Sequence, residues 1–479
     1  MPRVWTWLGI LALSAGAVGV IDFVSAPSPA AAQSGRMLSD PIPPASDDER
    51  VGTIKNKIGW THAKERLGWD MPNGNGVPVG QVEAPFRGGY LANTDHKQLK
   101  GTGFIPESGP SQQASGHATT VARHIVGPDA AGQGVKAIHG YEAGDWMGEG
   151  LLKLATTDGP TADQPARVFN HSWIMPGHIS APLILRRVDF LIDEHDVLVV
   201  CGLDNKPGRV PALLASAYNV ISVGVDSGMN TDGLTHIEGE GRCKPEIVAP
   251  GGKTSWSAGV VTGCVAALIE YADRMIDEDD AKGQNQDANK SEVVKAVLLA
   301  GAHKPAGWAP PEGEPLDRKL GAGVVDIDRS LVMLGAGHAE PDKPTDQRYG
   351  WSFAQVESNQ CRAYKFTIDK PQGDTTITLV WNRKVLGGTT EMKDPRTNEL
   401  RTVWNTGAFC PNLELELMKL DREGNAKPVA ASKSKVDNVE LIHLETLEPG
   451  RYEVRVSRVQ DGVKEAWDYA LAWRIEAGE

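Results

Sequence analysis

The stretch that decides the fold is KTSWSAGVVTG, residues 253–263. It places Ser255 at the start of a strongly apolar pattern that predicts a helix over residues 256–274. Taken alone, a serine at a helix start is usually a plain N-cap. The segment KPEIVAPG at residues 244–251 comes directly before it. These flanking residues make Ser255 a candidate for chemistry as well as for capping.

Two further segments lie upstream in the order acid, histidine, serine. GVPVGQVEA at residues 76–84 reads as a buried strand that ends in the carboxylate of Glu83. Open α/β sheets place their sites at the carboxyl ends of such strands. GHATTVA at residues 116–122 places His117 at the start of a helical pattern. A histidine there is usually structural by itself, as we expect for His124 two turns later.

The region around these segments alternates between strand and helix patterns from about residue 55 to 334. Its apolar runs predict buried strands at residues 77–82, 166–169, 197–200 and 220–225, and its helical stretches are 117–126, 181–193, 256–274 and 291–301. The strand runs are continuously apolar, as expected when both faces of a sheet are covered. The pattern predicts an α/β domain with a mostly parallel sheet flanked by helices.

The pattern changes after a linker predicted at residues 335–347. Leu413, Leu415 and Leu417 alternate with glutamates, which is the period of a half-buried strand. About eight short strands are expected between 351 and 475, with turns near residues 371–373, 422–425 and 448–450. Residues 348–479 are therefore predicted to form an all-β sandwich, jelly-roll-like in its arrangement.

The N-terminus has the pattern of a secretory signal peptide. Arg3 precedes an apolar run over residues 5–20, and three alanines at 30–32 offer a cleavage point. An uncleaved membrane anchor is the rival interpretation, but the run is short for a membrane span. We expect a signal peptide at 1–32 and a flexible lead-in at 33–54. The mature protein is then expected to be secreted, periplasmic or at the cell surface, with no stable membrane insertion.

The composition excludes several classes of protein. The chain has 479 residues and a net charge of −13, with no long basic run, which argues against nucleic acid as a partner. Five cysteines are too few for a disulfide-framed scaffold. Cys361 and Cys410 lie in the same region and are a possible pair. The other three, Cys201, Cys243 and Cys264, lie in apolar surroundings and are expected to be buried thiols.

Together the three segments resemble those of the subtilase family of serine proteases. The serine segment is similar to the family's Gly-Thr-Ser-Met-Ala-x-Pro-x-Val-x-Gly, and the histidine segment to its Gly-His-Gly-Thr-x-Val-Ala. KPEIVAPG at 244–251, VLVVCGLDN at 197–205 and GAGVVD at 321–326 match further family segments. The resemblance covers residues 60–334 or so and implies a subtilisin-like fold for the domain at 55–334. The sandwich resembles β-domains that follow secreted bacterial proteases.

The resemblance implies a role for each matching residue. Ser255 would be the nucleophile, His117 the general base and Glu83 the acid that orients the histidine. Asn205 would donate to the oxyanion together with the Ser255 backbone N–H. The segment at 170–173 is similar to the family's substrate-binding strand, and Ser172 and Trp173 would line the primary pocket, although ordinary strand filling explains them equally well. The implied activity is that of a secreted serine endopeptidase acting on polypeptides.

The sequence departs from the family pattern at several positions. Glu83 stands where an aspartate is expected, so a Ser-His-Glu triad is predicted, and the loop residue Asp95 is a weaker candidate for the acid. Lys253 replaces a glycine, Gly259 stands where proline is usual, and Gly202-Leu203-Asp204 makes the register of Asn205 uncertain by one residue. These departures motivate an alternative, a catalytically silent subtilase fold that binds partners through its sandwich. The retention of serine, histidine and asparagine argues against it.

No cofactor is predicted, and no metal site is assigned. Asp421, Asp437 and Asn438 are conceivable calcium ligands, but acidic turn residues are usually just solvated. The sequence gives no indication of the oligomeric state.

Overall fold

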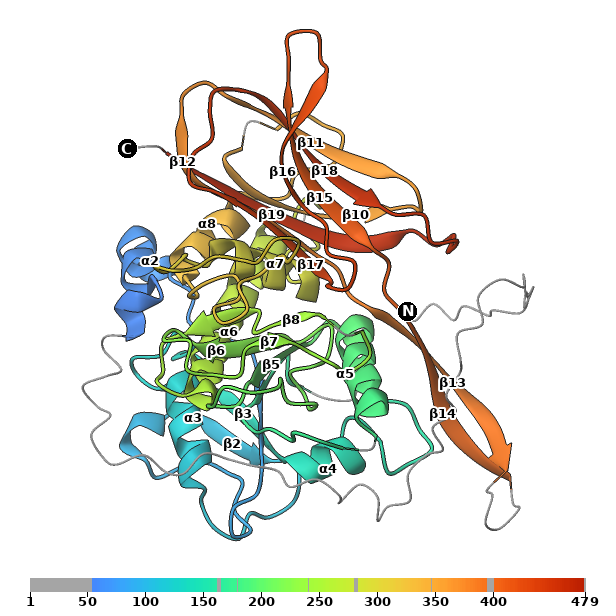
Figure 1. Ribbon diagram of the computed structural model, residues 1–479. Helices are drawn as coiled ribbons and strands as arrows, with labels where there is room; N and C mark the ends of the chain where they lie inside the picture. The colour runs from blue at the N-terminus through green and yellow to red at the C-terminus, as the bar shows by residue number, and fades with distance from the viewer. Residues whose placement is uncertain are drawn as a thin grey trace.

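The computed structural model describes residues 54–161, 165–178, 180–239, 241–279, 283–345, 347–393 and 400–477. The predicted signal peptide and nearly all of the predicted lead-in lie outside these residues. The described chain forms an α/β unit followed by a β-rich unit. In Figure 1 the α/β unit is at the bottom and the β-rich unit is at the top.

The first unit is built on a seven-stranded sheet in the order β2-β3-β1-β4-β5-β6-β9, and its neighbouring strands pair in parallel. The strands are β1 (Val79–Glu83), β2 (Gly103–Pro106), β3 (Ala137–Glu142), β4 (Val168–His171), β5 (Leu198–Gly202), β6 (Ile221–Val225) and β9 (Ile247–Ala249). A short antiparallel pair, β7 (Gly233–Leu234) and β8 (Cys243–Lys244), lies beside it. The predicted parallel sheet is confirmed.

Helices cover both faces of this sheet (Figure 1). They are α2 (Trp60–Leu67), α3 (Gly116–Val126), α4 (Ala143–Gly148), α5 (Ala181–His195), α6 (Thr254–Glu278), α7 (Ser291–Gly301) and α8 (Ile327–Gly335), with 3-10 turns η2 (Gly68–Asp70) and η3 (Lys97–Leu99). Within β1, Val79 belongs to the hydrophobic cluster that contains α3 and α6, and Val82 to the cluster around α4 and α5. Two buried faces explain why these strands are continuously apolar.

Helix α6 is the central helix of the first unit. Among the described residues it is the one helix long and apolar enough to cross a membrane, but its apolar side chains are buried within the fold. Its first two-thirds is a run of small and β-branched residues that contacts β4, β5, β6 and α3. We therefore read it as the core helix of a globular domain.

The second unit is a β-sandwich, as predicted. Two four-stranded antiparallel sheets, β10-β19-β12-β17 and β11-β18-β15-β16, enclose a separate hydrophobic cluster. Their strands are β10 (Tyr349–Val356), β11 (Cys361–Ile368), β12 (Gln372–Val380), β15 (Leu413–Leu420), β16 (Ala426–Ser432), β17 (Val439–Leu444), β18 (Gly450–Arg458) and β19 (Trp467–Ala477). The turn predicted at 422–425 lies between β15 and β16, whereas those predicted at 371–373 and 448–450 overlap the first residues of β12 and β18.

A hairpin of β13 (Lys384–Lys393) and β14 (Leu400–Phe409) leaves the sandwich and runs past α5 (Figure 1). Trp404 anchors it: its ring lies 5.2 Å from that of Phe190 and 4.6 Å from the Arg187 guanidinium, both on α5. The sequence analysis assigned this stretch to the sandwich. The hairpin forms a two-stranded sheet of its own, and contacts with α5 and, at its base, between Lys384 and Asp468 of β19 hold it in place.

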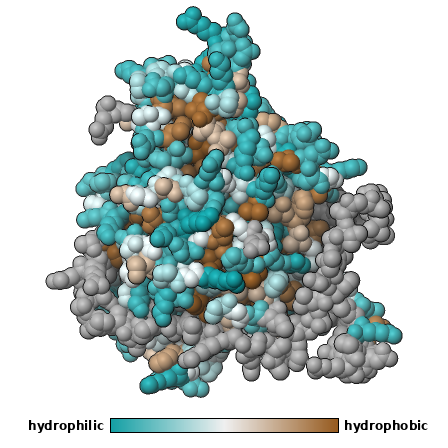
Figure 2. All heavy atoms as spheres, viewed as in Figure 1, coloured by the Kyte–Doolittle hydropathy of each residue, from teal (hydrophilic) through white to brown (hydrophobic). Residues whose placement is uncertain are grey.

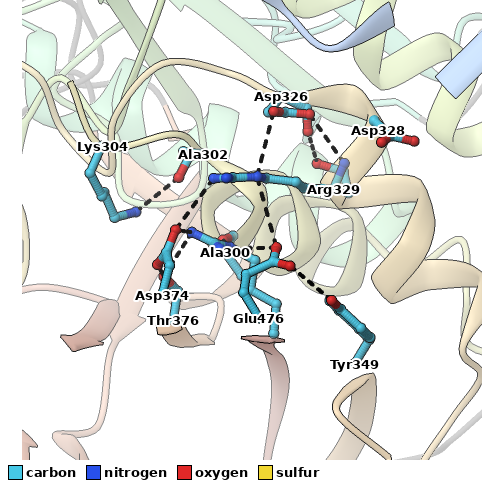
Figure 3. A network of polar contacts seen from close by, with 12 residues as sticks. Ala300, Ala302, Lys304, Asp326, Asp328, Arg329, Tyr349, Asp374, Thr376 and Glu476 are labelled. Carbon is cyan, nitrogen blue, oxygen red and sulfur yellow. Dashed lines mark hydrogen bonds and ion pairs between the residues drawn. The ribbon is translucent and has the colours of Figure 1, made fainter. Parts of the chain in front are cut away.

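Buried polar contacts join the two units where α7 and α8 meet β12 and β19 (Figure 3). Arg474 of β19 donates from Nε to the Ala300 carbonyl oxygen of α7 at 2.9 Å. Its guanidinium also lies 2.8 Å from the Asp374 carboxylate of β12, which Arg329 of α8 approaches at 3.5 Å. The sandwich therefore rests on the helices through fixed, directional contacts.

A second set of contacts between the units is centred on Arg383, at the base of the hairpin. Its guanidinium lies between the carboxylates of Asp189 on α5 and Glu238, with Nε 2.8 Å from the first and Nη1 2.9 Å from the second. The Arg383 main chain also exchanges two hydrogen bonds with the side chain of Asn219. Asp189 is fully buried and also accepts from the Asn219 backbone N–H at 2.8 Å, so donors from both units surround its carboxylate.

Cys361 and Cys410 do not pair in the structure. Cys361 begins β11, Cys410 leads into β15, and β18 lies between those two strands. Two strand spacings amount to about 9–10 Å, more than the ~7 Å between Cα atoms that a disulfide allows. The other three cysteines are buried thiols, as predicted.

On the face that Figure 2 shows, hydrophilic side chains predominate and hydrophobic ones form separate groups. Large apolar side chains that are exposed include Trp69, Leu386 and Leu400. Scattered exposure of this kind is ordinary for a protein surface in water.

Candidate active site

Glu83 is the last residue of β1, which lies inside the sheet between β3 and β4. Its side chain is fully buried. One carboxylate oxygen, Oε1, accepts a hydrogen bond from Gln81 Nε2 at 2.8 Å. A buried carboxylate at the carboxyl end of a central strand is where the sequence analysis expected the acid of the site.

His117 lies in the first turn of α3, which is capped by the Ser115 side chain accepting from Ala118 N. Its Nδ1 is 2.7 Å from Glu83 Oε2, and its side chain is 5% exposed. A carboxylate only accepts, so Nδ1 carries the proton and Nε2 is the basic nitrogen. Asp95, the weaker candidate, is exposed, and its backbone N–H donates to the side chain of Asn93.

Ser255 lies in the first turn of α6 and is 5% exposed. Its Oγ is 3.3 Å from the carbonyl oxygen of Ser172, which follows β4. Ser172 Oγ in turn donates to the Ser255 carbonyl oxygen at 2.9 Å and to Asn170 Oδ1 at 2.8 Å. These bonds hold the segment after β4 against the start of α6.

Helices α3 and α6 run in the same direction in close contact. A Cβ atom at Gly259 would lie 3.1 Å from the Val121 carbonyl oxygen, and one at Gly263 would lie 2.9 Å from the Ile125 carbonyl oxygen. One turn along α6 therefore corresponds to one turn along α3. The first turns of the two helices, which carry the histidine and the serine, lie at the same end. Glycine at 259, where proline is usual, permits this approach.

Asn205 follows β5 and contacts the residue before the serine. Its Oδ1 accepts from the Thr254 backbone N–H at 2.9 Å. With the amide oxygen held there, its NH₂ group lies on the other side of the side chain. Thr254 Oγ1 donates to the Leu203 carbonyl oxygen at 2.5 Å, which fixes the same loop. The asparagine thus lies beside the start of α6 despite the altered residues before it.

Trp173 is 2% exposed and lies in the hydrophobic cluster around α4 and α5. Its ring centroid is 5.9 Å from that of His171, which is 4.4 Å from the ring of Trp146. The side chain therefore packs the segment after β4 against this cluster, which corresponds to the ordinary strand-filling interpretation of Trp173. Burial lowers the pKa of His171 to about 3, so this second histidine stays uncharged at neutral pH.

The residues on either side of Ser255 pack against neighbouring side chains. Trp256, directly after Ser255, stacks on His124 at 5.9 Å with nearly parallel rings. His124 Nδ1 is also 2.8 Å from the Thr120 carbonyl oxygen, so its role is structural, as expected. Lys253 precedes α6, with its ammonium 5.7 Å from the Trp256 ring centroid.

The candidate calcium ligands are engaged in turns and domain contacts. Asp437 Oδ1 accepts from the Cys243 backbone N–H at 2.8 Å, and Asp421 accepts from the N–H groups of Glu423 and Asn425. In the described ranges, no group of three His, Cys, Asp or Glu side chains is arranged to hold a metal ion.

Solved structures similar to this chain include subtilisin-like proteins at low identity. The serine protease MycP1, an essential component of the type VII (ESX-1) secretion system, is 15% identical; the match covers 62% of this chain and 94% of MycP1, with a TM-score of 0.38. The PatG macrocyclase in complex with peptide is 16% identical over 61% of this chain and 98% of its own, with a TM-score of 0.40. Tripeptidyl peptidase 2 is 12% identical over 75% and 40%, with a TM-score of 0.31. No curated protein matches significantly.

The family comparison is decisive. The model of the subtilase family matches residues 90–351, more than half of the chain. His117, Asn205 and Ser255 lie within the matched range, whereas Glu83 precedes it. The parallel sheet, the order of the segments and this match agree: the chain belongs to the subtilase family.

Proposed function

We propose that this protein is an exported serine endopeptidase with a Ser255-His117-Glu83 triad. The observation that carries the proposal is the buried 2.7 Å contact between His117 Nδ1 and Glu83 Oε2, at the end of α3 that lies beside the start of α6. In this mechanism His117 Nε2 takes the proton of Ser255 as its Oγ attacks the scissile carbonyl, and later donates it to the leaving amine. Glu83 orients the imidazole and stabilises its charged form.

The negative charge of the tetrahedral intermediate would be stabilised by two N–H donors. One is the backbone N–H of Ser255, at the N-terminus of α6, where the helix dipole favours negative charge. The other is the Asn205 side-chain amide, whose oxygen is held by Thr254 N. In this class of site, loss of one such donor lowers kcat about 10²–10³-fold.

The substrate would be an extended polypeptide that pairs with the main chain following β4. Ser172 and Trp173 contribute main-chain groups there, and their side chains hold the segment in place. Main-chain pairing gives affinity without strict side-chain preference. The side-chain specificity would come from pockets alongside the segment.

A fluorophosphonate probe tests the enzymatic proposal. We expect one phosphonylated residue, Ser255, identified by peptide mass spectrometry, and no labelling of the Ser255→Ala variant. A peptide library incubated with wild type and this variant then gives the cleavage profile. Folded wild-type protein that neither reacts nor cleaves would contradict the proposal and favour a binding role for the sandwich.

The export part of the proposal rests on the sequence pattern of residues 1–32 alone. We expect protein expressed from the full chain to be recovered outside the cytoplasm with a mature N-terminus near Gln33. N-terminal sequencing of the fractionated protein is the measurement. Recovery of the chain with Met1 intact, in either the cytoplasm or the membrane fraction, would contradict it.

A further inference from the structure

The side chain of Gln81 bridges the strand that carries the acid and the helix that carries the base. It is 3% exposed, and Nε2 donates to Glu83 Oε1 at 2.8 Å and to the Ala118 carbonyl oxygen at 2.8 Å. Gln81 and Glu83 are two residues apart on β1, so both side chains point to the same face of the sheet. Ala118 directly follows His117 on α3.

The chemistry of the neighbours fixes which end of the carboxamide faces them. A carboxylate and a main-chain carbonyl both accept hydrogen bonds only, so the NH₂ end must face both. Its two hydrogens are then used, one by each acceptor. Both oxygens of Glu83 are consequently held, Oε1 by Gln81 and Oε2 by His117.

This matters because glutamate has one more rotatable bond than aspartate. A carboxylate on the longer side chain has more orientations in which it does not face the imidazole, and rotamer freedom must be removed to hold it. The Gln81 amide selects the orientation observed. It also supplies a donor to a fully buried charge, which would otherwise be costly.

We propose that Gln81 is a positioning residue of the triad, which holds the Glu83 carboxylate in register with His117 and so compensates for glutamate at the acid position. The inference rests on the proposed function, which it deepens. The side-chain amide of Gln81 donates to Glu83 and to the main chain of α3. It acts through Glu83.

The test is kcat and KM of Gln81→Met, measured per active site titrated with the fluorophosphonate. We expect kcat to fall about 10–100-fold, the scale of a misplacement of roughly 1 Å in a catalytic group, with KM unchanged. Gln372→Met is the matched control, because Gln372 is also 3% exposed and its Nε2 donates to a main-chain carbonyl, in the sandwich. It should leave kcat unchanged. Gln81→Asn, too short to reach both acceptors, serves if the methionine variant fails to fold.

A double-mutant cycle separates positioning from a purely structural role. In a Glu83→Ala background, Gln81→Met should change kcat by less than about twofold, because the group through which it acts is gone. An equal loss of kcat in both backgrounds would show that Gln81 only fastens β1 to α3, and would overturn the inference. So would an unchanged kcat in the single variant.

A spectroscopic readout makes the inference independent of turnover. The Nδ1 proton of His117, held by a carboxylate, should give a low-field proton NMR resonance that is absent from His117→Ala. Gln81→Met should shift or broaden it, whereas Gln372→Met should not. If wild type shows the resonance but no hydrolysis, the proposed function fails while the inference is still decided. A resonance unchanged in Gln81→Met overturns the inference.

Discussion

Replacing Glu83 by glutamine is expected to lower kcat about 10⁴-fold without unfolding the protein, the loss that follows when a triad histidine takes the wrong tautomer. The reason lies in the hydrogen bonds around the residue. Gln81 Nε2 donates to one of its oxygens at 2.8 Å, so the oxygen of the new amide must face Gln81. Its NH₂ then faces His117 Nδ1, which can only accept. The imidazole proton moves to Nε2, where it blocks proton transfer from the serine.

Steady-state kinetics on a peptide substrate at neutral pH give the measurement, with circular dichroism as the check of folding. Asp95→Asn is the matched control, since Asp95 is an exposed carboxylate in the loop between β1 and η3. It should leave kcat within about twofold, as expected for a surface substitution. A kcat for Glu83→Gln within tenfold of the wild-type value would contradict the placement of Glu83 in the proposed triad.

Replacing Arg383 by methionine is expected to lower the free energy of unfolding by about 3–5 kcal/mol, the usual cost of removing one partner from a buried ion pair. The guanidinium neutralises Asp189, which is fully buried, and Glu238. Methionine retains the volume and loses the charge. With about 2.1 cal/mol/K of unfolding entropy per residue over the described chain, the Tm should fall about 3–6 °C.

Differential scanning calorimetry measures this change. The double variant Arg383→Met/Asp189→Leu should recover part of the loss, because no buried charge is then left unpaired. Lys343→Met removes one partner of the exposed pair between Lys343 and Glu340 and should change the Tm by less than about 1 °C. A loss in Arg383→Met no larger than in Lys343→Met would mean that the interface is hydrated and weak.

Strands with continuous apolar runs were predictable from the sequence, and strands without them were not. β1, β4, β5 and β6 lie within a few residues of their predicted positions, because both faces of each are buried. β2 is largely exposed, at the edge of the sheet, and carries no such signal. The hairpin β13–β14 contains Gly387 and Gly388, which favour neither strand nor helix. It is held in place because Trp404 of β14 packs on Phe190 of α5, and these two residues are far apart in the chain.

The residues of the candidate site also differ in how far local sequence pattern predicts them. Serine, histidine and the strand-end carboxylate could be singled out as candidates because each lies at the start or end of an element with a strong local pattern. Gln81 was missed, since it reads only as a polar interruption in a buried strand. Its spacing of two from Glu83 was the available signal, because it places both side chains on one face. Helix α3 covers this face and brings the Ala118 carbonyl oxygen within hydrogen-bond distance of Gln81. This arrangement depends on tertiary packing, which the local sequence pattern does not encode.

The contact between Asp189 and Arg383 also has a consequence for folding during synthesis of the chain. Asp189 is synthesised 194 residues before the arginine that neutralises it. A first unit that folded before the sandwich had been synthesised would hold this buried carboxylate with hydrogen bonds from the Tyr218 and Asn219 backbone N–H groups but without its cationic partner. We therefore expect the first unit to reach its full stability only after the C-terminal sandwich has been made and docked, so that the last part of the chain to be synthesised completes the first.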